Sequence, residues 1–344
     1  MLSRPSKPTW LWGSSLSFVD QDRAGGGSGP VHIGLKQEGF AMSTIATTRP
    51  SKIGPARKKR IDWTGPLLVS PYLIYNIIFW VYPFVWGFII AFQKWNIISP
   101  DREFVGLDNF IKSLTNPQFW NALWVTFKFW IVFLPAVIVA SLGLAMLLQR
   151  IKRFRGLYIA GFLASYTMAG VAYSIIFNLL LAGNGMVNNA IWEIFHVRVP
   201  WFTDPRIAIA SIALVVVWKF IGYYGLIFLA GLQAIPRELY EAAAIDGASP
   251  WTCFWRITIP MINPSITIVF VFATILAFGI FTEPYLITGG GPLGSTQTFM
   301  LIIYQKTFEN LEAGYGSAMA ILMAAFSFGA VALVRKGVER EVEA

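Results

Sequence analysis

The sequence predicts an all-α, polytopic membrane protein with six transmembrane helices, and three observations support that fold class. Hydrophobic residues make up 56% of the 344-residue chain and charged residues only 13%, whereas a soluble domain has about 25% charged residues. The mean hydropathy is +0.58. Long charge-free stretches recur between Asp62 and Arg335, and each is long enough to cross a hydrocarbon core of about 30 Å.

The charge-poor windows place the six helices. An α-helix rises about 1.5 Å per residue, so about 20 apolar residues suffice for one crossing. We expect spans at residues 65–92, 121–148, 156–182, 206–232, 262–287 and 315–334.

Lys and Arg residues orient these spans, because cytoplasmic loops of membrane proteins are enriched in both. From Met42 onward, the connections on the side of the two termini contain fifteen of them: Arg49, Lys52, Arg57, Lys58, Lys59, Arg60, Arg150, Lys152, Arg153, Arg155, Arg237, Arg256, Arg335, Lys336 and Arg340. The opposite connections contain six: Lys94, Arg102, Lys112, Arg198, Arg206 and Lys306. We therefore expect both termini in the cytoplasm, and we assign the net charge of +9 to topology rather than to nucleic-acid binding.

The composition divides the chain into three parts. Residues 1–61 are expected to form a disordered, basic cytoplasmic segment, residues 62–336 the membrane domain, and residues 337–344 a cytoplasmic tail. Within the first part, residues 1–41 contain a flexible AGGGSG stretch and no periodicity. We interpret them as an upstream extension of an over-called reading frame, with a genuine disordered tail as the alternative. They lack the features of a signal peptide.

Two connections on the outer side have distinct patterns. In VGLDNFIKSLTNPQFW (105–120), Phe110, Ile111 and Leu114 recur at helical spacing, which predicts a short helix at the outer interface. The TGGGP stretch (288–292) follows an expected membrane helix rather than a strand, and no Lys-Ser pair follows it. We therefore expect a glycine-rich turn there and not a phosphate-binding loop.

The connection after the fourth span, residues 236–260, predicts two short helices that meet at an angle; we call this segment the elbow. Residues Arg237 to Ile245 are rich in alanine and glutamate, which favour helix. Gly247 suits the left-handed conformation that ends such a helix. Ser249 followed by Pro250 is typical of the start of the next one.

The residues of the elbow leave its role open. Ala242, Ala243 and Ala244 give a thin helix face that fits a partner's cleft, and Glu241 and Asp246 supply charge for pairing there. A connector that contacts no partner explains the same residues.

The elbow resembles the EAA motif, E-A-A-x(3)-G-x(9)-I-x-L-P, of importer permeases of the ABC (ATP-binding cassette) superfamily. Here the motif consists of Glu241-Ala242-Ala243, Gly247, Ile257 and Ile259-Pro260, with isoleucine at the family's leucine position. Three further stretches resemble the carbohydrate-uptake permeases in the same order: VGLDNF (105–110), PYLITGGGPLGSTQTF (284–299) and IYQKTFENLEAGYGSAMA (303–320). The resemblance runs from about residue 63 to 335.

This resemblance implies a bundle like that of the type I ABC importer permeases, in a bacterial inner membrane and surrounded by its lipid. It implies that a groove on a separate ATPase receives the residues Glu241, Ala242, Ala243, Asp246 and Gly247. The implied partners are a second homologous permease, two copies of the ATPase and an extracytoplasmic solute-binding protein; a homodimer of this chain is the alternative to the permease pair. No cofactor is expected in this chain, because the partner ATPase would bind ATP and Mg, and the sequence contains no G-x-x-x-x-G-K-[ST] motif.

Three charged residues fall inside expected spans: Lys128, Lys219 and Glu283. A charge at the bilayer centre costs about 2.5–3.5 kcal/mol on insertion scales, so it needs a partner or a wet cavity. We expect Lys219 and Glu283 to face the solute path or each other, and a purely structural ion pair is the alternative. Lys128 lies near the outer end of its span, where its ammonium group can reach the interface.

Three uncharged residues are further candidates for the solute path: Asn178, Tyr223 and Tyr224. Sugars offer C–H faces to aromatic rings and hydroxyls to amides. Ordinary helix packing is the alternative for all three residues.

The sequence predicts no catalytic and no metal site. Cys253 is the only cysteine, and His32 and His196 are the only histidines, which excludes an internal disulfide framework and a cysteine zinc site. A membrane-embedded enzyme would need an acid/base pair that is not evident. A secondary sugar transporter driven by an ion gradient is the alternative function, but it would usually show repeated halves and acidic residues near the midplane.

Overall fold

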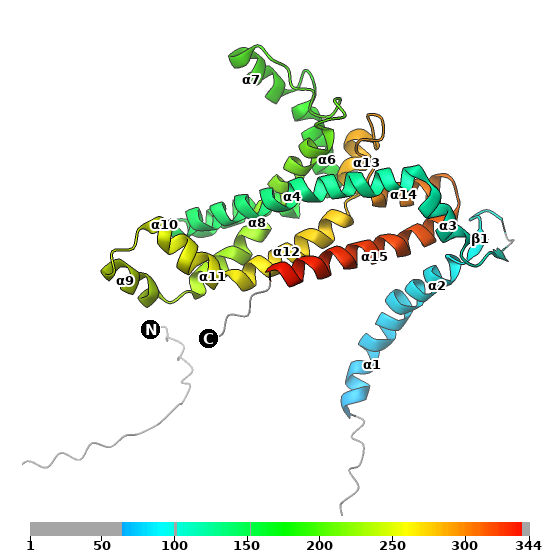
Figure 1. Cartoon of the computed structure of the whole chain (residues 1–344), viewed down its shortest axis with the longest axis horizontal. Helices are drawn as coiled ribbons and strands as arrows, with labels where there is room; N and C mark the ends of the chain where they lie inside the picture. Colours follow the sequence, from blue (N-terminus) through cyan, green and yellow to red (C-terminus); the bar gives the residue numbers. More distant parts are fainter. Residues whose placement is uncertain (1–63, 100–101, 152, 339–344) are drawn as a thin grey trace, which may run out of the picture. The chain divides into compact units, whose positions relative to one another are not determined.

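The computed structural model describes residues 64–99, 102–151 and 153–338 (Figure 1). The expectations for residues 1–61, including residues 1–41, and for residues 339–344 of the tail concern parts of the chain outside these ranges.

The described chain is mainly helical (Figure 1). Its elements, with π-helical turns labelled η, are α1 (Thr64–Asn76), η1 (Ile77–Val81), α2 (Tyr82–Ile90), β1 (Gln93–Trp95), β2 (Arg102–Phe104), α3 (Asp108–Thr115), α4 (Pro117–Arg150), α5 (Arg155–Thr167), α6 (Gly170–Leu181), α7 (Met186–Phe195), α8 (Ala208–Ala234), α9 (Arg237–Ile245), α10 (Pro250–Cys253), η2 (Phe254–Thr258), α11 (Ile259–Met261), α12 (Asn263–Phe278), α13 (Thr282–Thr288), α14 (Phe299–Tyr304), η3 (Gln305–Glu309) and α15 (Ala313–Val338).

The predicted all-α membrane fold is confirmed. Five helical stretches in the described ranges are long and apolar enough to cross a membrane, and a sixth results if the pair Pro250–Met261 and Asn263–Phe278, bent by 66°, counts as one span. The five are Leu67–Ile90, Pro117–Arg150, Gly170–Phe195, Ala208–Ala234 and Ala313–Leu333.

Two of the expected spans are not single helices. The third, 156–182, is interrupted between α5 and α6, because Met168 and Ala169 have ψ angles of 137° and 131° instead of helical ones. The fifth, 262–287, is interrupted between Phe278 and Thr282, which separates α12 from α13. Apolar periodicity could not predict these breaks, because the residues on both sides of each break are mostly apolar.

The core lies mainly between α4 and α8, which pack along each other. Large rings such as Phe129, Phe133 and Phe228 are fully buried there. Gly225 allows the close approach, since a Cβ at this position would lie 3.3 Å from Cδ2 of Leu144. Small residues at such contacts are typical of helices that pack within a membrane.

A small polar junction forms at the end of α4 opposite the elbow (Figure 1). Strands β1 and β2 pair antiparallel, with Gln93 opposite Phe104. The side-chain amide of Asn109, on α3, donates to the carbonyl oxygens of Ala91 and Gln93 at 2.9 and 3.0 Å. The short helix expected at 105–120 is present as α3, whereas the two three-residue strands gave no sequence signal.

The glycine-rich turn expected at 288–292 is also present. Gly289 ends α13 with φ +61°, and Gly290 follows with φ +89°. Both lie in the left-handed region that glycine adopts without a Cβ clash.

Candidate functional site

The elbow has the predicted local structure. Helix α9 covers Arg237–Ile245 and ends in a Schellman motif around Gly247, whose φ is +71°. The N–H of Ala248 donates to the carbonyl of Ala243 at 2.9 Å, and the N–H of Gly247 to that of Ala244 at 3.1 Å. Only glycine occupies this position without strain, so the direction change is set by the sequence.

The second arm of the elbow starts as expected and is tied to the first. The hydroxyl of Ser249 accepts a hydrogen bond from the N–H of Thr252 at 3.2 Å, with Pro250 at the first helical position. The hydroxyls of Tyr240, in α9, and Thr258, at the end of η2, lie 2.8 Å apart and form a hydrogen bond. Because this bond joins the two arms, the angle between them is fixed by side chains as well as by the backbone.

The predicted coupling residues lie on the surface of the elbow. Glu241, Ala242, Asp246 and Gly247 are exposed, and Ala243 is half-buried. Two large apolar side chains are exposed beside them: Ile245 with 87% and Trp251 with 69% of their surface. Exposed apolar side chains grouped with charges are typical of a surface that binds a partner.

A buried ion pair connects α8 with α13. The Nζ of Lys219 lies 3.0 Å from Oε1 of Glu283, and the side chains are only 12% and 5% exposed. The ammonium group also lies 5.4 Å from the ring centroid of Tyr173 and 5.7 Å from that of Phe220. Lys219 and Glu283 were expected to face either the solute path or each other, and the structure shows that they face each other.

The ion pair borders a cavity and two helix breaks. A cavity of about 360 Å³ is lined by Lys219 and Glu283 together with Phe220, Phe272, Phe281 and Thr282, among others. Small-molecule sites generally have volumes of ~300–1,000 Å³. Gly170 starts α6 directly beside the pair, since a Cβ at this position would lie 3.4 Å from Nζ of Lys219 and 3.1 Å from Cγ2 of Thr282. Both interrupted spans therefore meet α8 at the ion pair.

The other sequence candidates lie on α4, α6 and α8. Tyr223 is half-buried and stacks on Tyr166 at a centroid distance of 4.6 Å. Tyr224 is 1% exposed and belongs to the core cluster, and Asn178 is half-buried on α6. Lys128 is exposed, with its Nζ 5.5 Å from the ring centroid of Trp124.

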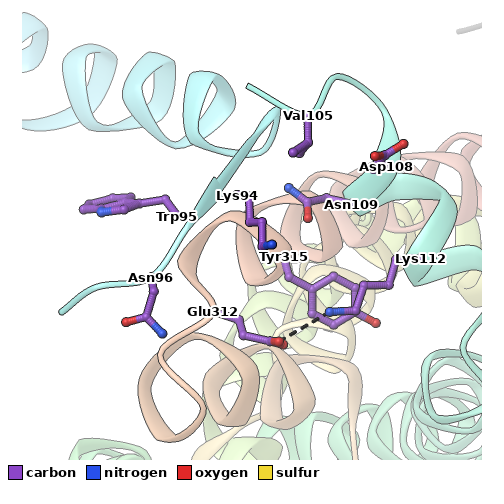
Figure 2. Close-up of a pocket in the computed structure, with 9 residues that line it drawn as sticks. All are labelled: Lys94, Trp95, Asn96, Val105, Asp108, Asn109, Lys112, Glu312 and Tyr315. Carbon is purple, nitrogen blue, oxygen red and sulfur yellow. Dashed lines mark hydrogen bonds and ion pairs between the residues drawn. The ribbon is translucent and has the colours of Figure 1, made fainter. Parts of the chain in front are cut away.

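A second cavity, which the sequence did not predict, lies at the polar junction (Figure 2). Its volume is about 360 Å³, and its lining includes Lys94, Trp95 and Asp108. Figure 2 shows Lys112 meeting Glu312 beside Tyr315; the Nζ–Oε1 distance is 3.3 Å, and Nζ lies 4.4 Å from the ring centroid. The paired residues are 200 positions apart, so no local sequence pattern could have indicated the contact.

Comparison with known proteins identifies relatives across most of the chain. Residues 66–340 match the family described as "Binding-protein-dependent transport system inner membrane component". The sulfoquinovosyl glycerol transport system permease protein SmoG of Agrobacterium fabrum is 35% identical over 266 residues, which cover 76% of this chain and 85% of that protein. The lactose transport system permease protein LacF of Rhizobium radiobacter is 33% identical over 294 residues, covering 83% and 97%.

A solved structure has the same fold. The crystal structure of a bacterial ABC transporter involved in the import of the acidic polysaccharide alginate contains a chain that aligns with a TM-score of 0.71 at 22% identity. The alignment covers 82% of this chain and 97% of that chain.

Proposed function

The chain belongs to the family of binding-protein-dependent transport system inner membrane components, and from this premise we propose that it is a permease subunit of an ABC importer for a sugar or glycerol derivative. Such a subunit carries out no chemistry of its own. It alternates between an outward-facing and an inward-facing arrangement, while a separate ATPase supplies the free energy. The observation that carries the proposal is the buried Lys219–Glu283 pair beside a cavity, in a chain whose relatives are transport permeases.

The solute path is proposed to pass the cavity beside the ion pair. A buried pair has lost its hydration, which makes it expensive to maintain unless geometry compensates. Its position at two helix breaks supports a functional role, because broken membrane helices generally occur where backbone lines a cavity. The relatives' names support a carbohydrate as the solute. Among the uncharged candidates, Tyr223 and Asn178 keep exposed surface that a sugar can contact, whereas Tyr224 would need a rearrangement of the core.

The elbow is proposed to dock on the ATPase through Glu241, Ala242, Ala243, Asp246 and Gly247. The exposed charged and small residues support this role, and so does the side-chain bond between Tyr240 and Thr258. When ATP closes the ATPase dimer, the elbow would move as one body and pull on α8 and α12, which flank it in the chain. Hydrolysis would return the bundle to the inward-facing arrangement.

The complete importer is proposed to contain a second homologous permease, two ATPase copies and an extracytoplasmic solute-binding protein, with both termini of this chain in the cytoplasm. The family description supports the binding protein. The distribution of Lys and Arg supports the orientation.

Solute uptake into proteoliposomes tests the proposal. With the full complex, we expect accumulation of a sugar that requires ATP and the binding protein and stops with vanadate. Uptake that follows an ion gradient and ignores vanadate would instead establish the secondary transporter.

Crosslinking tests the elbow separately. In a Cys253→Ser background, which removes the only cysteine, Ala244→Cys should crosslink to a cysteine in the ATPase groove. Ala230→Cys is the matched control, because it is exposed on α8 but lies within the span. A crosslink from Ala230→Cys and none from any exposed elbow position would contradict the docking role.

A further inference from the structure

Four aromatic side chains form a continuous series that starts at the cavity beside the Lys219–Glu283 pair. The ring of Phe281 lies 5.2 Å from that of Tyr285 and 5.0 Å from that of Tyr304, and Tyr304 lies 5.4 Å from Phe308. Tyr285 and Tyr304 are also neighbours, at 5.2 Å. We call Phe281, Tyr285, Tyr304 and Phe308 the aromatic ladder.

The two ends of the ladder lie at two different places in the fold. Phe281 lines the cavity that contains Lys219 and Glu283. Phe308 is in η3, four residues before Glu312, which lines the cavity at the polar junction. By the orientation expected from Lys and Arg, the polar junction is on the outer side. The ladder therefore runs from the outer surface to the proposed solute path.

The ladder is accessible and is not part of the core. Phe308 is 61% and Tyr285 is 37% exposed, while Phe281 and Tyr304 are half-buried. None of the four belongs to either buried cluster of the described chain.

Polar groups accompany the rings, which argues against a surface that faces lipid chains. The side-chain amide of Gln297 donates to Oε1 of Gln305 at 2.9 Å, next to Tyr304 in the chain. Lys306 and Glu309 belong to the same π-helical turn, η3, as Phe308. Charged groups in contact with hydrocarbon are expensive, so this surface is expected to be wet.

Resting on the proposed function, we propose that the aromatic ladder is an entry subsite for carbohydrate rings, occupied before the solute reaches the cavity at the ion pair. Ring faces accept the C–H face of a pyranose, and the neighbouring amides and phenol hydroxyls offer hydrogen bonds to its hydroxyl groups. A subsite of this kind raises the affinity for solute on the outer side without taking part in the conformational switch.

Uptake kinetics of the complete complex in proteoliposomes test this subsite. The wild-type complex is first offered radiolabelled glucose, lactose and sulfoquinovosyl glycerol, and the imported sugar is used for the variants. Tyr304→Ala and Phe308→Ala should each raise the half-saturating concentration roughly 3- to 10-fold, as expected for loss of one stacking contact, with an unchanged maximal rate. Tyr304→Phe retains the ring and should raise the half-saturating concentration less than Tyr304→Ala does.

Two control variants distinguish loss of the ring face from poor folding and from loss of an unrelated exposed ring. Tyr304→Leu retains apolar volume without a ring face, so it should raise the half-saturating concentration as Tyr304→Ala does, and it replaces Tyr304→Ala in the test if the alanine variant folds poorly. Phe328→Ala removes a 77% exposed ring on α15 outside the ladder and should change nothing. Import by wild type with unchanged half-saturation in the alanine and leucine variants would overturn the subsite, as would a lower maximal rate alone. Uptake by the wild type that needs no ATP and ignores vanadate would instead overturn the proposed function.

Discussion

The two ion pairs of the described chain have similar distances but opposite surroundings. Lys219 and Glu283 are 3.0 Å apart with side chains 12% and 5% exposed, whereas Lys112 and Glu312 are 3.3 Å apart with side chains 56% and 41% exposed. Both join distant parts of the sequence, and in both the lysine also lies near an aromatic ring. Judged by these distances alone, the two ion pairs would be expected to contribute equally to stability.

Burial makes the two pairs different in kind. An exposed pair contributes about 0–1 kcal/mol, because water already solvates both charges. For a buried pair, removing one partner leaves an uncompensated charge and costs about 3–5 kcal/mol, although replacing both partners by apolar residues can be neutral. We call the exposed pair Lys112–Glu312 the outer pair and the buried pair Lys219–Glu283 the inner pair. The outer pair thus stabilises the junction only weakly. The members of the inner pair depend on each other, and the two interrupted helices meet at them.

Breaking the inner pair should cause the largest loss in the free energy of unfolding. We expect Lys219→Met to lower the free energy of unfolding by about 3–5 kcal/mol, because the Glu283 carboxylate is left buried and alone. Thermal unfolding of the purified chain in detergent measures this. The double variant Lys219→Met with Glu283→Leu should recover most of the loss, and a single variant as stable as the wild type would show that the pair is wet.

Both members of the inner pair were predicted from the sequence, and neither member of the outer pair was. Lys219 and Glu283 were conspicuous because a charge inside an apolar span demands an explanation. Lys112 and Glu312 lie in polar connections, where charges are ordinary. Likewise, Gly247 and Ser249–Pro250 fixed the elbow through local backbone preferences, whereas the breaks at Met168–Ala169 and 279–281 lie in mostly apolar stretches, where the spacing of apolar residues does not mark a helix end.

A substitution that disturbs the packing near the inner pair should cause the second largest loss of stability. A Cβ at Gly222, on α8, would overlap the carbonyl oxygen of Phe162 on α5, which is backbone and cannot move aside cheaply. We expect Gly222→Ala to destabilise the chain by about 1–3 kcal/mol. Gly143→Ala, on α4, is the control, because nothing lies within 4 Å of its Cβ position; there the change should stabilise by roughly 0.5–1 kcal/mol. Unfolding midpoints that move equally for the two variants would refute the tight α5–α8 contact.

Breaking the outer pair should have the smallest effect. We expect Glu312→Gln to lower the free energy of unfolding by less than about 1 kcal/mol at low salt. In 1 M salt, where the Debye length is about 3 Å, we expect no measurable change. Unfolding midpoints at the two salt concentrations measure this. The loss in Lys219→Met should be nearly independent of salt, because buried pairs are screened much less; equal salt dependence of the two variants would remove the contrast between the pairs.

We propose that the cavity beside the buried pair belongs to the solute path, and the accessibility of Thr282, which lines this cavity, provides a test. In a Cys253→Ser background, Thr282→Cys is treated with a charged, membrane-impermeant thiol reagent in the complete complex. The control is Ile131→Cys, which is 54% exposed on α4, lies within a candidate span and does not line the cavity. We predict that Thr282→Cys is modified in at least one nucleotide state, that the transported sugar protects it, and that Ile131→Cys does not react. Modification that the sugar leaves unchanged, or none in any nucleotide state, would contradict it.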